Sequence, residues 1–159
     1  MNEVVLSSTE CLIAKFVGNQ RNRLSLRTKI NMRRDIDQED EEMNIQAVGA
    51  EMAVAKHLNV YPEFSPSEGK LPDFDMVWNG KKVDVKRNHL WDGDLLIPKL
   101  NPERFYILAC GSLPKYHIIG GLLGAEVPKV GQWVELSKGP CWRVHPIHLR
   151  FIPREEPKF

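Results

Sequence analysis

The segment Phe74–Arg87, FDMVWNGKKVDVKR, constrains the fold more than any other part of the chain. Its centre is the pair Asn79-Gly80, which tolerates the positive φ angles that a two-residue turn requires. β-Forming residues flank this pair on both sides, namely Met76, Val77, Val83 and Val85. The segment therefore predicts a β-hairpin, and with it a sheet as one layer of the fold.

Two helices are predicted ahead of this hairpin. Ser and Thr N-cap candidates, followed by apolar residues at helical spacing, predict a first helix near residues 8–25. A second helix over Asn44–Val60 is indicated more strongly, since at ~100° per residue one face collects Ile45, Val48, Met52, Ala55 and Leu58. The opposite face collects Gln46, Ala50, Ala53, Lys56 and His57.

Glu51 lies near the middle of the apolar arc of this second helix. An ionised carboxylate in that position needs a cation, a metal ion or hydrogen bonds, because leaving it unpaired costs several kcal/mol. The hydrophobic pattern alone therefore does not explain Glu51.

The rest of the chain predicts further strands within the same domain. Residues 61–72 are rich in Pro, Ser and Gly and predict a loop. After the hairpin, short apolar runs separated by Gly and Pro predict strands in DLLIPKL, RFYILACG, KYHIIGGLL and GQWVELS. The 159 residues fit one domain, with a helical part over about 1–60 and a sheet-rich part over about 72–152. The fold class expected is α+β, or α/β, in a single domain.

Composition says more about the cellular compartment of the protein than about its function. The apolar runs are too short to span a membrane, and the N-terminus lacks the basic and apolar pattern of a signal peptide. Three cysteines, an odd number without a CxxC pair, favour a reducing environment, so we expect a cytoplasmic protein. A P-loop is absent from the sequence, so no nucleotide cofactor is expected.

Charge is distributed unevenly although the net charge is only +1. Six Lys/Arg and no acid fall between Arg21 and Arg34, and six acids and no base fall between Asp35 and Glu42. The two segments could be solvated surfaces that neutralise each other, or the basic segment could contact phosphate. Bulk charge alone does not predict a nucleic-acid partner.

Three acids and a lysine surround the predicted hairpin. Asp84 and Lys86 project from the same side of their strand, and either Asp73 or Asp75 can lie beside Asp84 across the turn. Neighbouring carboxylates repel unless a cation intervenes, and hard oxygen ligands select Mg²⁺, Mn²⁺ or Ca²⁺. With a lysine to stabilise negative charge, the set suits hydrolysis of a phosphodiester. The alternative is an edge strand with an ordinary surface ion pair.

This order of residues resembles the PD-(D/E)xK nuclease superfamily, which has the restriction-endonuclease-like fold. The resemblance depends on GAEMAVAKHL for the helix glutamate, PDFD for the first acid, and VDVK for the second acid and the lysine. The Arg-rich start and the later DLLIPK, RFYILACGS and YHIIGGLLGAEVPK segments are similar to bacteriophage-encoded members. The resemblance implies a mixed β-sheet flanked by N-terminal helices, and Mg²⁺-dependent cleavage of DNA, with Mn²⁺ as a substitute.

The resemblance also assigns roles to residues. It implies Asp84 and Lys86 as the acid and lysine of the motif and Glu51 as the helix carboxylate. Asp73 follows a proline, as the motif name suggests, but Asp75 has the spacing to Asp84 that we associate with this form of hairpin, so Asp75 is favoured as the first acid and Asp73 is the second choice. Asp75, Asp84 and the Val85 carbonyl would hold the metal, Glu51 a water of its shell, and Lys86 would orient the attacking water.

The expected partner is DNA, gripped along its phosphate backbone without sequence readout. The residues expected to do so are Arg21, Arg23, Arg27, Lys81, Lys82 and Arg87. Small nucleases of this group often act as homodimers. The alternative is a catalytically inactive nuclease-fold module that binds DNA or a host or phage protein.

Overall fold

The computed structural model of the chain describes residues 2–31, 38–64 and 73–157, and of residues 25–31 and 38–39 it describes the backbone only. Strand β1 (Asn2–Val5) leads into two long helices, α1 (Ser8–Asn31) and α2 (Gln38–Leu58). The elements that follow are β2 (Met76–Trp78), β3 (Lys81–Asn88), β4 (Leu95–Ile97), β5 (Phe105–Ser112), β6 (Lys115–Leu123), the 3₁₀ turn η1 (Gly124–Glu126), α3 (Val127–Val130), β7 (Gln132–Leu136), β8 (Gly139–Val144) and the 3₁₀ turn η2 (Pro146–His148). None of the helices in the described ranges is both long and apolar enough to cross a membrane.

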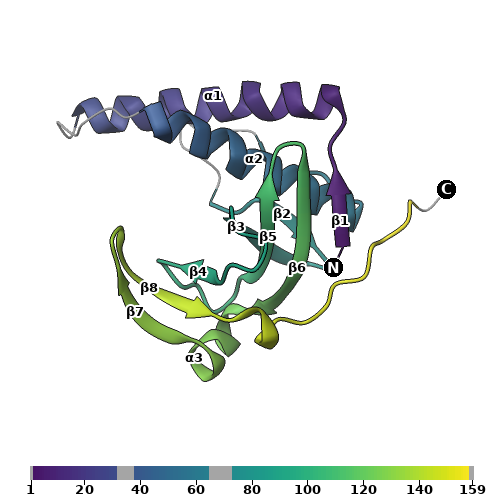
Figure 1. Cartoon of the computed structure of the whole chain (residues 1–159), viewed down its shortest axis with the longest axis vertical. Helices are drawn as coiled ribbons and strands as arrows, with labels where there is room; N and C mark the ends of the chain where they lie inside the picture. Colours follow the sequence, from purple (N-terminus) through teal and green to yellow (C-terminus); the bar gives the residue numbers. More distant parts are fainter. Residues whose placement is uncertain (1, 32–37, 65–72, 158–159) are drawn as a thin grey trace.

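The strands form two sheets. The larger has the order β1-β6-β5-β3-β2, in which β3 and β5 run parallel and the other neighbours antiparallel. The smaller is antiparallel, with the order β4-β8-β7. Helices α1 and α2 lie together on one side of the larger sheet, and the smaller sheet lies on the other (Figure 1). The prediction of an α+β fold with a mixed sheet and N-terminal helices is confirmed.

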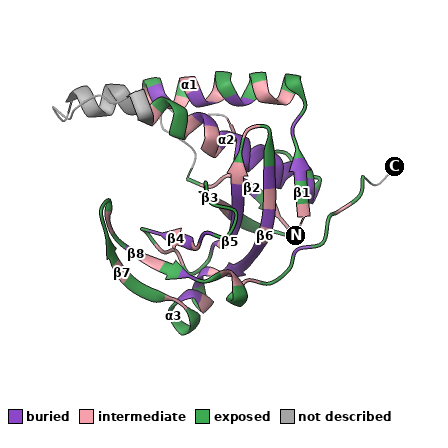
Figure 2. Cartoon of the chain, viewed as in Figure 1, coloured by how far each residue is buried: buried purple, intermediate pink, exposed green. Residues whose placement is uncertain are grey.

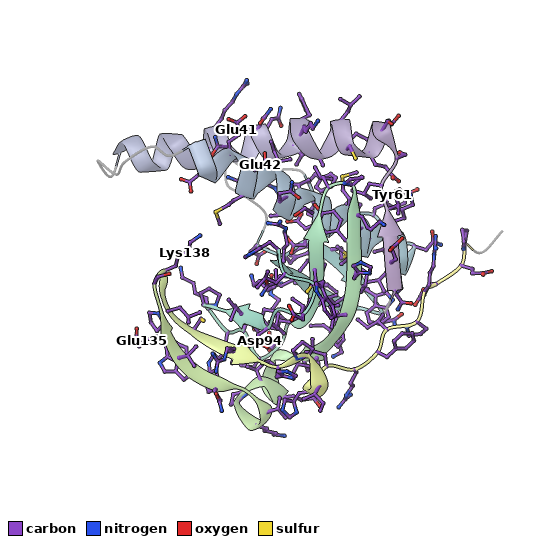
Figure 3. All side chains as sticks on the ribbon, viewed as in Figure 1. Glu41, Glu42, Tyr61, Asp94, Glu135 and Lys138 are labelled. Carbon is purple, nitrogen blue, oxygen red and sulfur yellow. The ribbon has the colours of Figure 1, made fainter. Side chains whose placement is uncertain are left out.

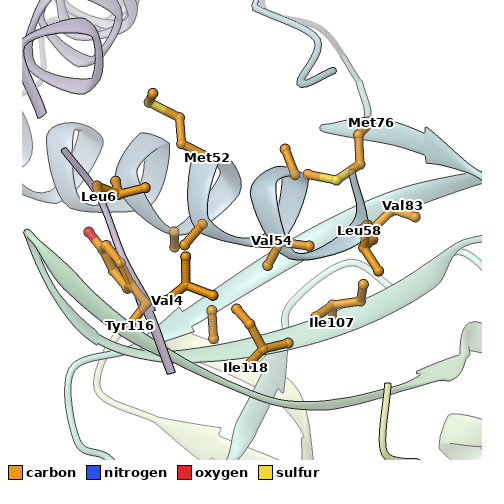
Figure 4. Packing of buried hydrophobic residues seen from close by; sticks show 14 of the residues in the cluster. Val4, Leu6, Met52, Val54, Leu58, Met76, Val83, Ile107, Tyr116 and Ile118 are labelled. Carbon is orange, nitrogen blue, oxygen red and sulfur yellow. The ribbon is translucent and has the colours of Figure 1, made fainter. Parts of the chain in front are cut away.

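Strand β5 separates two hydrophobic cores. Ile107 and Ala109 belong to the cluster beneath α2, whereas Tyr106, Leu108 and Cys110 belong to the cluster beneath the smaller sheet. All five are buried, so the strand is covered on both faces (Figure 2). Figure 4 shows the first cluster, in which residues of α2, β1, β3, β5 and β6 interdigitate. The larger sheet is therefore the central layer, which explains the uninterrupted apolar sequence of β5.

Helix α2 is buried on more than the one face that its hydrophobic pattern predicted. Ala50, Ala53 and His57 were placed on the opposite face, yet all three are buried. The reason is that α1 packs along α2, and the C-terminal segment covers its end through a 2.8 Å contact between His57 Nε2 and the Ile152 carbonyl. Both helices also extend beyond the predicted bounds, α1 to Asn31 and α2 back to Gln38.

The predicted hairpin is confirmed. Asn79 (φ 50°) and Gly80 (φ 74°) form its turn, and Met76 pairs with Val83 across it. Strands β1 and β8 were not predicted from the sequence. Strand β8 begins with Gly139-Pro140, which is turn chemistry, and is held as the central strand between β4 and β7.

Gly18 sets how closely α1 approaches α2. A Cβ at this position would lie 2.6 Å from Ile45 Cα, a backbone atom that cannot move aside alone. We expect Gly18→Ala to lower the free energy of unfolding by about 1–3 kcal/mol, because the forced separation outweighs the gain in helix propensity. Denaturant unfolding measures the change. Gln20→Ala, on the exposed side of α1, is the matched control and should change stability by less than about 0.5 kcal/mol. Equal stability of the two variants would contradict this packing.

Candidate functional site

A pocket of about 410 Å³ lies between α2 and β3. It is lined by all four side chains predicted for catalysis: Glu51, Asp75, Asp84 and Lys86. The tip of the β7–β8 hairpin reaches its rim, where Lys138 Nζ lies 3.5 Å from the sulfur of Met43, a residue of the pocket wall (Figure 3). The fold thus brings a helix, a hairpin and the turn of the smaller sheet to one place.

Because strand β2 is short, part of β3 is left without a β2 partner where it lines the pocket. In the described part of the chain, β2 pairs with β3 only as far as Val83, so the edge of β3 beyond that residue is open. The Val85 amide donates to Asp75 Oδ2 at 2.6 Å across this edge. Because the amide and carbonyl of a strand residue point to the same side, the Val85 carbonyl is also directed to the edge where Asp75 lies. Val85 lines the pocket.

Glu51 is buried in the pocket wall, with 5% of its surface exposed. One carboxylate oxygen accepts a hydrogen bond from Arg21 Nη1 at 2.7 Å, while Oε2 has no hydrogen-bond partner among the described residues. Burial raises the pKa of the Glu51 carboxyl, and the hydrogen bond and charge of Arg21 offset only part of this rise. The inward glutamate therefore has a cationic partner, as the sequence required, but keeps one free oxygen.

Arg21 has a different position from the one predicted for it. It was expected to grip phosphate, but its guanidinium is buried against Glu51 and lies 5.8 Å from the Phe64 ring centroid. Burial lowers the pKa of Arg21, but the hydrogen bond and charge of Glu51, with the charge of Asp75, together outweigh burial and raise this pKa. Arg21 thus offsets the charge of Glu51 in the pocket wall and is not available on the surface.

Asp75 lies near enough to Glu51 for each carboxyl group to affect the pKa of the other. Burial, followed by the charge of Glu51, raises the pKa of Asp75 to about 8, although the Val85 amide opposes the rise. The pocket therefore holds more negative charge than Arg21 alone neutralises. A proton on Asp75 is one way to balance it, and a divalent cation is another.

The raised pKa of Asp75 makes stability depend on pH. Since the folded protein binds this proton more tightly than the unfolded chain, the stabilisation is full below about pH 4 and is lost as pH rises through about 8. Asp75→Asn, which keeps an acceptor for the Val85 amide, should remove this dependence and be more stable than wild type above pH 8 in EDTA. Denaturant unfolding from pH 4 to 9 measures the difference. If the stability difference between Asp75→Asn and wild type stayed constant across this range, the raised pKa of Asp75 would be contradicted. Asp92→Asn, at an exposed position, is the control.

Asp84 and Lys86 lie side by side on β3, on the face opposite Val85. Lys86 Nζ is 2.7 Å from Asp84 Oδ1, and both side chains are partly exposed. The charge of Asp84 contributes to the raised pKa of both Glu51 and Asp75, so the three carboxyl groups share one electrostatic environment. The helix acid, two of the hairpin acids and the lysine thus line one pocket.

Asp73 does not occupy the same place as Asp75. Its side chain is 71% exposed at the edge of the pocket, and its Oδ2 accepts from Arg104 Nη2 at 2.9 Å. Of the two candidates for the first acid, Asp75 is the one that lies against Glu51 and Val85. Arg104, which the sequence analysis missed, adds a buried cation near the pocket and had no distinguishing sequence signal.

The other basic residues predicted to contact DNA are more dispersed. Arg23, Lys81 and Lys82 are exposed, with Lys82 Nζ 5.0 Å from the Phe74 ring centroid. Arg87 lines the pocket but donates to the Gly111 carbonyl and to Ser112 Oγ, each at 2.8 Å. The side chain of Arg27, residues 32–34 of the basic segment and residues 35–37 of the acidic run lie outside the described part of the chain.

The oxygen atoms of the pocket suit a hard divalent cation, although some of them are now paired with Arg21 or Lys86. Within residues 2–31, 38–64 and 73–157, no three His, Cys, Asp or Glu side chains already stand close enough together to hold an ion. Arg21 and Lys86 instead engage Glu51 and Asp84. Yet the unpartnered Glu51 Oε2, the Val85 carbonyl and Asp75, once Asp75 has given up its proton, are oxygen ligands of the kind Mg²⁺ prefers. Asp84 could complete the set by releasing Lys86.

Comparison of the chain with family models, curated proteins and solved structures gives no match.

Proposed function

We propose that the chain is a Mg²⁺-dependent deoxyribonuclease of the PD-(D/E)xK type that hydrolyses DNA phosphodiester bonds. The observation that carries the proposal is the convergence of Glu51, Asp75, Asp84 and Lys86 on one pocket. Helix and hairpin supply them independently, and an ordinary surface ion pair would not require a buried Glu51 or an Asp75 that holds its proton to about pH 8.

In the proposed mechanism, Asp75, Asp84 and the Val85 carbonyl would hold the metal ion. A bound Mg²⁺ would make water easier to deprotonate and would offset the charge that develops on the phosphate. Lys86, once separated from Asp84, orients the attacking water and stabilises the negative charge of the transition state. Glu51, fixed by Arg21, would bind a water of the metal's shell through its free oxygen.

The exposed cations Arg23, Lys81 and Lys82 are proposed to hold the phosphate backbone of the DNA. Contacts of this kind position a strand and do not read its sequence. Such an enzyme would act in the cytoplasm, that of the host cell if the chain is phage-encoded.

A second candidate is a non-catalytic module that binds DNA or a protein through the same fold. It is favoured by the ion pairs Arg21–Glu51 and Lys86–Asp84, which occupy the acids that a metal would need. In such a module the pairs would be permanent, whereas in a nuclease Mg²⁺ would replace at least the contact of Lys86.

Incubation of plasmid, linear and branched DNA with the protein tests the proposal. We expect cleavage of at least one substrate with Mg²⁺ or Mn²⁺ and none with EDTA. Metal binding without cleavage of any of the three would favour the non-catalytic module.

A further inference from the structure

A second pocket, of about 370 Å³, adjoins the first. It shares Asp73, Asp84 and Lys86 with the first pocket, so the two meet at the proposed catalytic pair. Its remaining lining comes from the segment before β5 and from β5 itself, namely Pro98, Lys99, Asn101, Arg104 and Tyr106. This second wall is not used in the mechanism above.

The wall is held in place by the buried Tyr106. The Tyr106 hydroxyl accepts a hydrogen bond from the Asn101 amide at 2.8 Å and lies 3.4 Å from the Lys99 carbonyl, to which it can donate. Tyr106 is itself packed in the core beneath the smaller sheet. The backbone that carries Lys99 is therefore anchored, while the Lys99 side chain is exposed and has no ion pair recorded among the described residues.

Arg104 provides a buried cation in the same wall. Its residue surface is 8% exposed, its guanidinium lies 5.7 Å from the Phe74 ring centroid, and its Nη1 has no hydrogen-bond partner among the described residues. Its Nη2 binds the carboxylate of Asp73, which is otherwise solvent-exposed. The Asp73 carboxylate therefore shows that Arg104 can bind an anion at this position. Because Asp73 is exposed, its ion pair with Arg104 contributes little free energy and another anion can replace it.

We propose that the second pocket is a phosphate-binding subsite, which takes a phosphate group of the nucleic acid next to the bond cleaved at Asp84 and Lys86. The proposal rests on the nuclease function above. Three cations, Lys86, Lys99 and Arg104, face two carboxylates there, so the pocket has an excess of positive charge. Arginine and lysine donors on a fixed wall suit a phosphate oxygen, and the phosphate would take the place of Asp73.

The phosphate could be an internal backbone diester or the monoester at a strand end. The first would position DNA for cutting within a strand, and the second would select strand ends. Both sources present the same oxygens to Lys99 and Arg104, so an experiment has to separate them.

Binding of labelled single-stranded oligonucleotides in EDTA, with and without a terminal 5′-phosphate, tests the subsite without requiring catalysis. We expect Lys99→Gln to weaken binding and to reduce the slope of log K against log salt by about 1, as for the loss of one phosphate contact. Asp73→Asn should strengthen binding about fivefold, because it removes a competing anion. Lys129→Gln, an exposed lysine on α3, is the control and should leave the slope unchanged. Both test residues are exposed, and thermal unfolding confirms that their variants fold.

The pattern of effects distinguishes the possible results. A 5′-phosphate that strengthens wild-type binding, with the gain lost in Lys99→Gln, identifies the strand end as the source; equal binding of both oligonucleotides with the same lysine effect identifies the backbone. Unchanged affinity and slope in Lys99→Gln and Asp73→Asn, or no binding by wild type, would overturn the subsite. If the subsite is overturned but Mg²⁺-dependent cleavage is still observed, the proposed nuclease function stands. If phosphate binding is confirmed but no DNA is cleaved, the nuclease function is contradicted and the phosphate-binding subsite stands.

Discussion

Replacing Asp84 with asparagine is expected to reduce Mg²⁺-dependent DNA cleavage by on the order of 10³-fold. The asparagine keeps the shape of the side chain but removes the negative charge that would hold the metal ion. Without a bound metal ion, the site lacks the cation that activates the attacking water. Lys86→Ala should reduce cleavage by a similar factor, because its amine is the one side chain proposed both to orient the attacking water and to stabilise the charge of the transition state. Rates measured on a single DNA substrate under single-turnover conditions give both values.

The two substitutions should separate binding from chemistry. Asp84→Asn should lose Mn²⁺ affinity, whereas Lys86→Ala should keep it. Since both side chains are partly exposed, neither change should alter the free energy of unfolding by more than about 1 kcal/mol. Asp92→Asn and Lys129→Ala make the same charge changes on exposed surface and should cut DNA at the wild-type rate. Equal cleavage by wild type, Asp84→Asn and Lys86→Ala would remove these residues from the mechanism.

Arg21→Met is expected to lower the free energy of unfolding by about 3–5 kcal/mol at pH 8 in EDTA. The substitution leaves the Glu51 carboxylate buried without its cation, next to Asp75. Without Arg21 the pKa of Glu51 rises further, so the loss should shrink at lower pH, where the carboxyl takes up a proton. Mn²⁺ should restore part of the stability, because an ion that binds only the folded protein stabilises it.

Two further variants make this prediction specific. The double variant Arg21→Met/Glu51→Leu should recover most of the stability, since no buried charge is then left unpaired, but it should not respond to Mn²⁺ as Arg21→Met does. Arg23→Met, an exposed position on the same helix, should be nearly neutral. A stable Arg21→Met protein at pH 8 would show that the ion pair does not support the pocket.

Local sequence signals predicted the hairpin and its charged residues well. Asn79-Gly80 specifies a turn almost alone, and strand alternation then places Asp84 and Lys86 on one side and Val85 on the other. Glu51 was noticed because a carboxylate in an apolar arc needs a partner. Each of these inferences uses neighbours within a few positions along the chain.

The partners of these residues could not be predicted in the same way. That Arg21 contacts Glu51 depends on how closely α1 packs on α2, which Gly18 permits but no local pattern specifies. The choice between Asp73 and Asp75 likewise depends on the end of strand β2, where the Val85 amide becomes free to bind Asp75. Strand β8 and the pairing of Arg104 with Asp73 arise from tertiary packing of distant segments.

Crystals grown with Mn²⁺ and measured at the manganese absorption edge test the central claim most directly. An anomalous peak bounded by Asp75, Asp84 and the Val85 carbonyl, with Lys86 separated from Asp84, is the result expected. The claim would be contradicted by an empty pocket in which Lys86 still binds Asp84 and Arg21 still binds Glu51, if the protein also fails to cleave DNA at the same Mn²⁺ concentration.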